Sequence, residues 1–224
     1  MVEPGPLIAE GRDNLIYDAG PGRILRVSRT GKSLEAEARV IAFARESGLP
    51  VPEVYEATAD RIEMERVAGP NMLEAMAARP WSLPRHARTL ADLHGAVHAV
   101  AAPAWLASAS TGAGPTLVHL DLHPLNVVVT SEGPVLIDWT NAGAGRPEDD
   151  VAMTWLLLAA GGVDGSLSQR ALAAVARRLL LRRFLAAAGR PPAEALRTVV
   201  NVKAADPHMT AREVATMRAL AELA

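Results

Sequence analysis

Four polar residues near the middle of the chain have types and spacings suited to phosphate chemistry. His119, Asp121 and Asn126 follow the pattern H-x-D-x-x-x-x-N, and Asp138 ends the short apolar run that comes next. A hydroxyl that attacks a phosphate needs a carboxylate to orient it and to accept its proton. Magnesium, which offsets the charge of phosphates, prefers oxygen ligands such as carboxylates and amides. The pattern therefore fits phosphoryl transfer to a hydroxyl group.

The same residues resemble the catalytic segment of kinases. Protein kinases carry H-R-D-x-x-x-x-N and then D-F-G. The sequence HLDLHPLN, followed by LIDW, is more similar to the aminoglycoside phosphotransferase/choline kinase family. The loop of that family typically reads H-G-D-x-H-x-x-N before I-D-W or I-D-F. His123 and Trp139 match this second version, whereas Leu120 replaces a residue that is usually small.

The resemblance implies a role for each of these positions. Asp121 would be the base that orients the acceptor, with His119 as the second catalytic residue, and Asn126 and Asp138 would bind Mg²⁺. ATP would be the phosphate donor and a hydroxyl of a small molecule the acceptor. Two short strands between residues 127 and 137 would form a hairpin that returns Asp138 to the loop.

Two other interpretations of the segment remain open. His119, Asp121 and His123 alternate, so a strand would place them on one face, as in a metallohydrolase site. Pro124 argues against a continuous strand there, and the neighbouring sequence offers no further His or Cys to complete a zinc site. A buried histidine next to a solvated loop carboxylate would be a purely structural reading.

Composition narrows the class of protein. Half of the 224 residues are hydrophobic, which is enough for one sizeable core or two small lobes. A formal net charge of −2 does not favour nucleic acid as a partner, and the lack of cysteine excludes disulfides and thiol chemistry. The longest apolar stretch, residues 151–163, is too short to span a bilayer. We expect a cytoplasmic monomer or weak dimer without a membrane partner.

The first part of the chain reads as a small sheet. Strands are predicted at Leu7–Glu10, Leu15–Asp18 and Ile24–Ser28, separated by turn residues. The turn at residues 11–14 lies where a kinase has its phosphate-covering loop, but it contains a single glycine. Arg26 stands where a kinase has a phosphate-binding lysine, and the resemblance admits arginine at this position.

A helix predicted at 32–47 supplies an ion-pair partner for that arginine. Glu37 lies in phase with the apolar residues Leu34, Val40 and Ile41, so it faces inward. An inward carboxylate requires a cationic partner. We therefore expect Arg26 and Glu37 to form the counterpart of the strand-lysine to helix-glutamate pair of kinases.

The strands predicted at 53–58 and 61–67 lead to a hinge. The sequence IEMERV ends at Ala68-Gly69-Pro70, which breaks the strand pattern. By the kinase resemblance, backbone groups of Glu65 and Val67 would bind adenine, with Met64 packed behind them. We expect residues 1–67 to form a nucleotide-binding lobe and residues 68–224 a helical lobe with the catalytic loop and the acceptor site.

The helical part contains further polar residues of interest. His94 and His98 lie four residues apart on the helix predicted at 82–100, where packing is favoured over zinc binding. Acidic residues at 148–150 open the next helix and complement its dipole. Asp150-Val151-Ala152 matches the Asp-Leu-Ala with which the resembled family anchors its catalytic loop.

Acceptor specificity is the least determined property. His123, Glu148 and Asp149 are candidate substrate contacts. From residue 138 to the end of the chain, nine acidic and eleven basic residues give a net charge of +2. A polycationic aminoglycoside would prefer an acidic rim, so antibiotic resistance is not favoured.

Taken together, the sequence predicts a protein-kinase-like α+β fold with a β-rich N-lobe and a mostly helical C-lobe. The predicted function is ATP- and Mg²⁺-dependent phosphorylation of a small-molecule hydroxyl. The alternative is a non-catalytic kinase-like module that binds nucleotide or a partner. Two features support this alternative: Arg26 stands in place of lysine, and the turn at residues 11–14 contains a single glycine.

Overall fold

The computed structural model describes residues 2–11, 13–31, 33–160, 166–205 and 211–222. The chain divides into two compact units. The first comprises Met1–Asn71 and Val127–Thr140, and the second comprises Met72–Asn126 and Asn141–Ala224. The first unit is rich in strands and the second is mostly helical, which confirms the predicted α+β composition.

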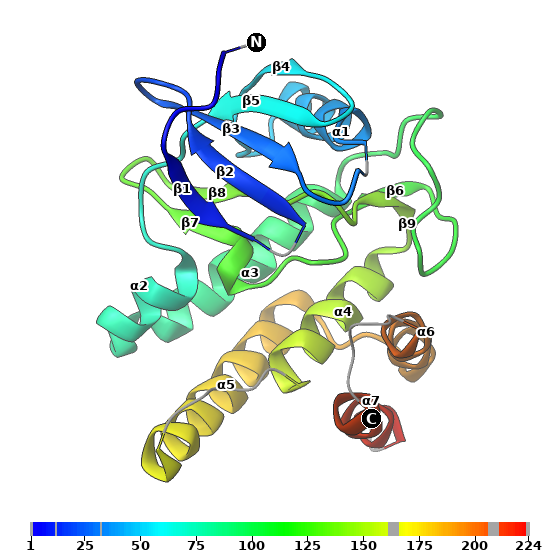
Figure 1. Cartoon of the computed structure of the whole chain (residues 1–224). Helices are drawn as coiled ribbons and strands as arrows, with labels where there is room; N and C mark the ends of the chain where they lie inside the picture. Colours follow the sequence, from blue (N-terminus) through cyan, green and yellow to red (C-terminus); the bar gives the residue numbers. More distant parts are fainter. Residues whose placement is uncertain (1, 12, 32, 161–165, 206–210, 223–224) are drawn as a thin grey trace. The chain divides into compact units, whose positions relative to one another are not determined.

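A five-stranded antiparallel sheet forms most of the first unit, in the order β1-β2-β3-β5-β4 (Figure 1). Its strands are β1 Leu7–Glu10, β2 Asn14–Asp18, β3 Arg23–Ser28, β4 Val54–Ala57 and β5 Arg61–Glu65. Helix α1, Glu35–Glu46, packs against β4 and β5. Its buried stripe contains Val40 and Ile41, as the apolar phase predicts, and it also contains Glu37.

A hairpin distant in sequence completes the first unit. It consists of β7, Val127–Val129, and β8, Pro134–Leu136. The Val129 N–H donates to the Pro70 carbonyl at 2.8 Å, and the Leu136 N–H donates to the Pro50 carbonyl at 2.7 Å. These bonds tie the hairpin to the segments that flank the last two strands of the sheet.

Gly69 allows the backbone before Pro70 to approach strand β7 of the hairpin closely. Its φ is +149°, and a Cβ at this position would lie 2.4 Å from the Val129 carbonyl oxygen, which no side chain could tolerate. The first unit consequently extends to Asn71 and includes residues 127–140. The expected boundary after Val67 and the assignment of the hairpin to the helical lobe both differ from this division.

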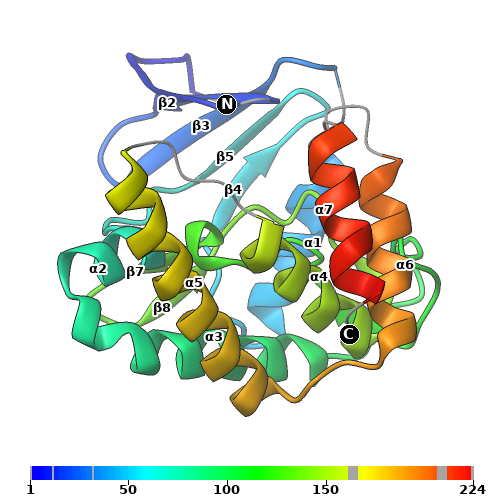
Figure 2. The same ribbon diagram turned by 90° about the horizontal axis from the view of Figure 1, so that it is seen from below.

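The second unit contains most of the helices. They are α2 Met72–Ala78, α3 Leu83–His98, α4 Pro147–Ala160, α5 Leu167–Ala188, α6 Ala193–Ala204 and α7 Ala211–Glu222. Helix α5 packs against α3 and α4, and α6 lies beside α7 (Figure 2). Two short strands that the sequence did not predict, β6 Thr116–Val118 and β9 Gly143–Gly145, pair antiparallel.

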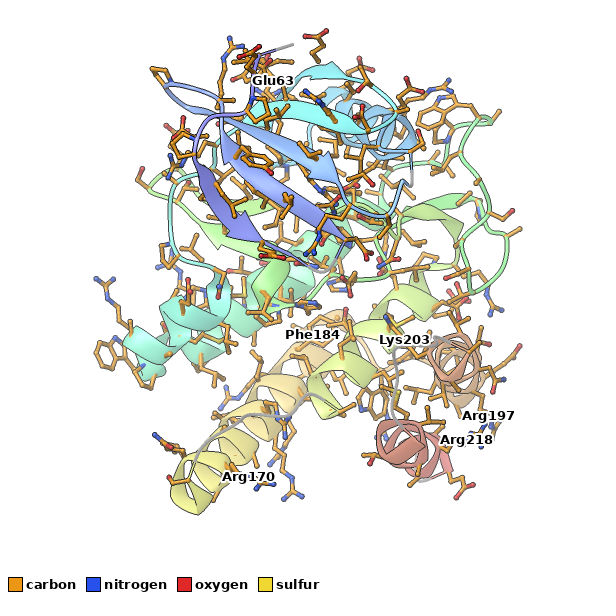
Figure 3. The ribbon with its side chains drawn as sticks, in the orientation of Figure 1. Glu63, Arg170, Phe184, Arg197, Lys203 and Arg218 are labelled. Atoms are coloured by element: carbon orange, nitrogen blue, oxygen red, sulfur yellow. The ribbon has the colours of Figure 1, made fainter. Side chains whose placement is uncertain are left out.

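The core of the second unit lies beneath the segment with the catalytic motif. Val118 and Leu120 are buried with side chains of α4, α6 and α7, among them Met153, Leu196 and Met217. The ring of Phe184, labelled on α5 in Figure 3, is fully buried and lies 5.1 Å from the ring of His94. No helix in the described part of the chain is long and apolar enough to cross a membrane.

Candidate catalytic site

The catalytic motif of the second unit folds into a compact loop between β6 and a 3-10 turn, Pro124–Asn126. The amide nitrogen of Asn126 donates to the backbone carbonyl of Asp121 at 2.9 Å and to its Oδ2 at 3.1 Å. The side chain of Asp121 is 20% exposed, and its Oδ1 lies 3.6 Å from Nε2 of His123. The loop thus presents an oriented, accessible carboxylate with an amide and an imidazole beside it.

A buried carboxylate from α4 holds this loop in place. Asp150 is fully buried; its Oδ2 accepts from the His119 N–H at 3.0 Å and its Oδ1 from the Leu120 N–H at 2.7 Å. Nε2 of His98 lies 2.9 Å from Oδ2. Burial alone would raise the pKa of Asp150, but the His98 hydrogen bond and nearby histidine charges outweigh burial and lower it below its usual range.

Leu120, the residue before Asp121, has an unusual backbone conformation. Leu120 has φ +58°, in the left-handed region that side chains rarely adopt. This explains why a small residue suits the position. In this chain the leucine side chain is 1% exposed within the core, so its burial offsets the backbone strain.

The structure bears on the assignment of His119. Its side chain is fully buried, and its backbone N–H is bonded to Asp150. This buried position favours a role in positioning the loop over direct contact with a substrate. The catalytic role of His119 stays a prediction.

The two histidines of α3 belong to the support of the loop. Nδ1 of His94 lies 2.8 Å from the Leu90 carbonyl, and Nε2 lies 2.9 Å from the Thr154 hydroxyl. That hydroxyl is 2.6 Å from the carbonyl of Leu122. Burial lowers the pKa of His94 to about 4. His94 and His98 both contribute to packing and hydrogen bonding around the loop, as the sequence favours.

The first unit carries a second group of polar residues, centred on a buried ion pair. Nη1 of Arg26 donates to Oε1 of Glu37 at 2.6 Å. Arg26 is 8% exposed and Glu37 is 6% exposed. The geometry is what the phases of the strand and the helix predict.

This ion pair extends to the residues that follow the hairpin. Nη2 of Arg26 lies 3.8 Å from Oδ1 of Asp138, and the Trp139 N–H donates to Oε1 of Glu37 at 3.2 Å. Asp138 has φ +62°, and its side chain is 45% exposed. A non-glycine residue held in this conformation marks a position that the surroundings over-determine.

Asn14, the first residue of β2, also contacts the arginine. With its amide oxygen facing Arg26, it accepts from Nε at 3.0 Å and from Nη2 at 2.7 Å, while its amide nitrogen donates to the Asp13 carbonyl at 3.1 Å. The turn at residues 11–14 therefore contributes a side-chain amide at this place. The sequence predicted only a turn with a single glycine here.

The side chains present are compatible with a magnesium ion. The Asn126 side chain makes its two hydrogen bonds to Asp121 through its nitrogen. Its amide oxygen can therefore serve as a metal ligand. The contacts of the Asp138 carboxylate within the described residues use Oδ1. Hard oxygen donors of this kind, few in number and supplemented by phosphate and water, are what Mg²⁺ selects. The described residues contain no cluster of three or more His, Asp or Glu side chains that could hold a metal ion by themselves.

Comparison with known proteins then decides the family. Residues 5–111 and 101–196 match the model of the phosphotransferase enzyme family, APH. The chain belongs to this family. The resemblance of its catalytic motif, which pointed to aminoglycoside phosphotransferases and choline kinases, is confirmed.

One curated relative of this chain is a probable bifunctional tRNA threonylcarbamoyladenosine biosynthesis protein from Methanoculleus marisnigri. It is 30% identical over 146 residues, which cover 59% of this chain and 23% of the relative. The match thus spans less than a quarter of the relative's length.

Solved structures share the fold of this chain. A streptomycin–ATP ternary complex of APH(2'')-IIa has a TM-score of 0.67 at 11% identity, over 100% of this chain and 92% of that one. A choline/ethanolamine kinase family protein from Mesorhizobium loti has a TM-score of 0.56 at 19% identity, over 98% of this chain and 87% of that one. These similarities confirm the protein-kinase-like, two-lobed α+β fold.

Two further predicted site residues, Asp149 and Glu148, have different surroundings. Asp149 is fully buried and is held by Arg146, with Nε–Oδ2 and Nη2–Oδ1 distances of 3.0 and 3.1 Å. Burial and this ion pair do not favour the substrate contact that the sequence predicts for Asp149. Glu148 is half-buried at the start of α4 and keeps that possibility.

The predicted hinge lies at the end of β5. Met64 is buried, in agreement with a packing role, and it pairs with Ile24 of β3. The Glu65 N–H donates to the Glu53 carbonyl at 2.8 Å. A nucleobase contact from Glu65 would consequently use its carbonyl oxygen, with Val67 as the second backbone partner.

Proposed function

We propose that this phosphotransferase transfers the γ-phosphate of ATP to a hydroxyl of a small molecule in a Mg²⁺-dependent reaction. One observation carries the proposal. Asp121 is an accessible carboxylate, oriented by Asn126, on a loop that a buried Asp150 anchors. Such a carboxylate can orient a hydroxyl and accept its proton.

Each residue of the two groups has a role in this proposal. Asp121 accepts the proton of the attacking hydroxyl, and Asn126 keeps the carboxylate turned toward it. Arg26, fixed by Glu37, faces the phosphates of the nucleotide, and the Glu65 carbonyl with the Val67 backbone contacts the adenine. Magnesium, held by Asn126 and Asp138, would offset phosphate charge.

The acceptor that we propose is a neutral or singly charged hydroxylated metabolite. Several neighbours of the same fold are complexes with streptomycin or hygromycin B. In this chain Asp149 is occupied by Arg146, which leaves Glu148 as the acidic candidate at the start of α4. A single carboxylate could receive one amine, whereas a polycation would require several.

The test is a screen of amino alcohols, sugars, polyols and aminoglycosides that follows ADP release. Asp121→Asn should lower turnover about 10²–10⁴-fold while nucleotide binding persists. Asp92→Asn, at an exposed position of α3, is the matched control and should retain full activity. Equal turnover of Asp121→Asn and wild type would refute the assignment of the base.

A nucleotide- or partner-binding module is the second candidate. The observations behind it are Arg26 at the position of the kinase lysine and the single glycine, Gly11, in the turn at residues 11–14. Such a module would be stabilised by ATP with Mg²⁺ and yet release no ADP with any acceptor of the screen. That pattern would favour the module over the small-molecule kinase.

A further inference from the structure

The hydroxyl of Thr140 lies among three charged side chains of the first unit. Oγ1 accepts from Nη2 of Arg26 at 3.1 Å. It lies 3.0 Å from Oε2 of Glu37 and 2.8 Å from Oδ1 of Asp138. Thr140 itself is exposed, so its contribution comes from these contacts rather than from burial.

A count of protons shows what the hydroxyl can do. Arg26 is a donor, so Oγ1 must accept from it, and the single hydroxyl proton is left for one of two carboxylates. Both alternatives are hydrogen bonds to ionised groups, which are shorter and stronger than neutral ones. The hydroxyl can therefore donate to Asp138 in one orientation and to Glu37 in the other.

We propose that Thr140 is a positioning residue for Asp138 and that it links this carboxylate to the Arg26–Glu37 ion pair. By holding Oδ1, the hydroxyl fixes the rotamer of Asp138 and leaves Oδ2 for a cation. When a cation draws charge from Asp138, the proton can turn to Glu37, so neither carboxylate is left without a partner. This inference rests on the proposed function, in which Asp138 binds Mg²⁺.

The same contact accounts for arginine at a position where kinases have lysine. Arginine presents a rigid, planar fork, and here Nη1 reaches Glu37 at 2.6 Å while Nη2 reaches Thr140 at 3.1 Å. The ammonium of a lysine is a single point and has no such second arm. Arg26 and Thr140 therefore form a matched pair.

The experiment compares Thr140→Val, which keeps the shape but removes the hydroxyl, with Thr140→Ser, which keeps the hydroxyl. The measured quantity is the Mg²⁺ concentration that gives half of the thermal stabilisation by saturating ADP. We expect Thr140→Val to raise this concentration about tenfold, in line with the loss of one hydrogen bond to a charged group. Thr140→Ser should stay within about twofold of wild type.

Thr58→Val is the matched control. The Thr58 hydroxyl lies 3.0 Å from Oδ1 of Asp60, so it is also a threonine two residues from an aspartate, in an exposed turn of the same unit. The Thr58→Val substitution should leave the Mg²⁺ requirement unchanged. In addition, Arg26→Lys should weaken Mg²⁺ binding less in the Thr140→Val background than in wild type, because the Nη2 contact is already lost.

The outcomes separate two failures. The positioning role is refuted if Thr140→Val has the Mg²⁺ requirement of wild type. It is also refuted if Thr140→Val and Thr140→Ser have the same Mg²⁺ requirement. In both cases the proposed function stands. A wild-type protein that ADP stabilises equally with and without Mg²⁺ refutes the metal role of Asp138, and the inference falls with it. Because Thr140 is exposed, its Val and Ser variants are expected to fold.

Discussion

The backbone N–H of Leu120 donates a 2.7 Å hydrogen bond to Oδ1 of Asp150, thirty residues further along the chain. The bond joins the start of the loop that carries Asp121 to the first turn of α4. It also accompanies the left-handed conformation of Leu120, so one buried carboxylate and one unusual φ angle together direct the following Asp121.

Asp150→Asn should lower the free energy of unfolding by roughly 2–4 kcal/mol, because the buried N–H groups of His119 and Leu120 lose a charged acceptor. Urea unfolding measures the change. Asp92→Asn, on the exposed face of α3, is the control and should stay within about 0.5 kcal/mol of wild type. A similarly small effect of Asp150→Asn would show that the loop does not depend on this anchor.

Leu120→Gly should be less destabilising than Leu122→Gly by about 1–2 kcal/mol. Both leucines are almost completely buried in the same loop, so both variants lose comparable core contacts. Only the change at Leu120 also relieves the strain of a positive φ. Chemical denaturation of the two variants in parallel measures the difference, and equal losses would mean that the leucine is not strained.

Glu37→Ala should destabilise the protein by about 3–5 kcal/mol, because it leaves the buried guanidinium of Arg26 without its ion-pair partner. Glu35→Ala, two residues earlier on the exposed face of α1, should change stability by less than about 0.5 kcal/mol. Unfolding free energies of both variants are the measurement. If the two variants behaved alike, the ion pair seen in the first unit would have no energetic weight.

The stability of the protein should fall in mild acid because of His94. Burial lowers the pKa of this group from 6.5 to about 4, so the unfolded chain binds a proton below pH 6.5 that the folded chain does not bind until about pH 4. The unfolding free energy should therefore decrease as the pH falls through this window, by on the order of 3 kcal/mol.

The comparison of wild type with His94→Gln between pH 4 and 7 isolates this contribution, and the variant should show the shallower dependence. The opposite slope would mean that His94 is an imidazolium. A charged ring would supply a proton for each of the three contacts along the chain from Leu90 through Thr154 to Leu122, where a neutral ring and one hydroxyl supply only two.

Much of the fold follows from the order of residue types. Apolar alternation and turn residues predicted the strands β1 to β5 within one or two residues at each end, and the apolar phase of α1 identified Glu37 as the inward carboxylate. The motif from His119 to Asp138 indicated the chemistry, because the types and spacing of catalytic residues are local properties. Roles in nucleotide and acceptor binding remain predictions.

Other features depended on contacts between residues far apart in the chain. Asp149 and Asp150 look alike in the sequence as acidic residues of a first helical turn, yet one is held by Arg146 and the other anchors the loop. Which carboxylate meets which donor is set by how the side chains of α4 are directed, and neighbouring positions on a helix point about 100° apart.

The places of Thr140 and of the hairpin at 127–137 were decided in the same way. A threonine after an Asp-Trp pair does not by itself predict a role for its hydroxyl, because the role depends on a hydrogen bond from an arginine 114 residues away. The hairpin joins the first unit through bonds to Pro50 and Pro70 that no local pattern announces. Sequence by itself determined the elements and the reactive groups, whereas tertiary structure decided their partners, because hydrogen bonds and burial depend on distance in space and not on separation along the chain.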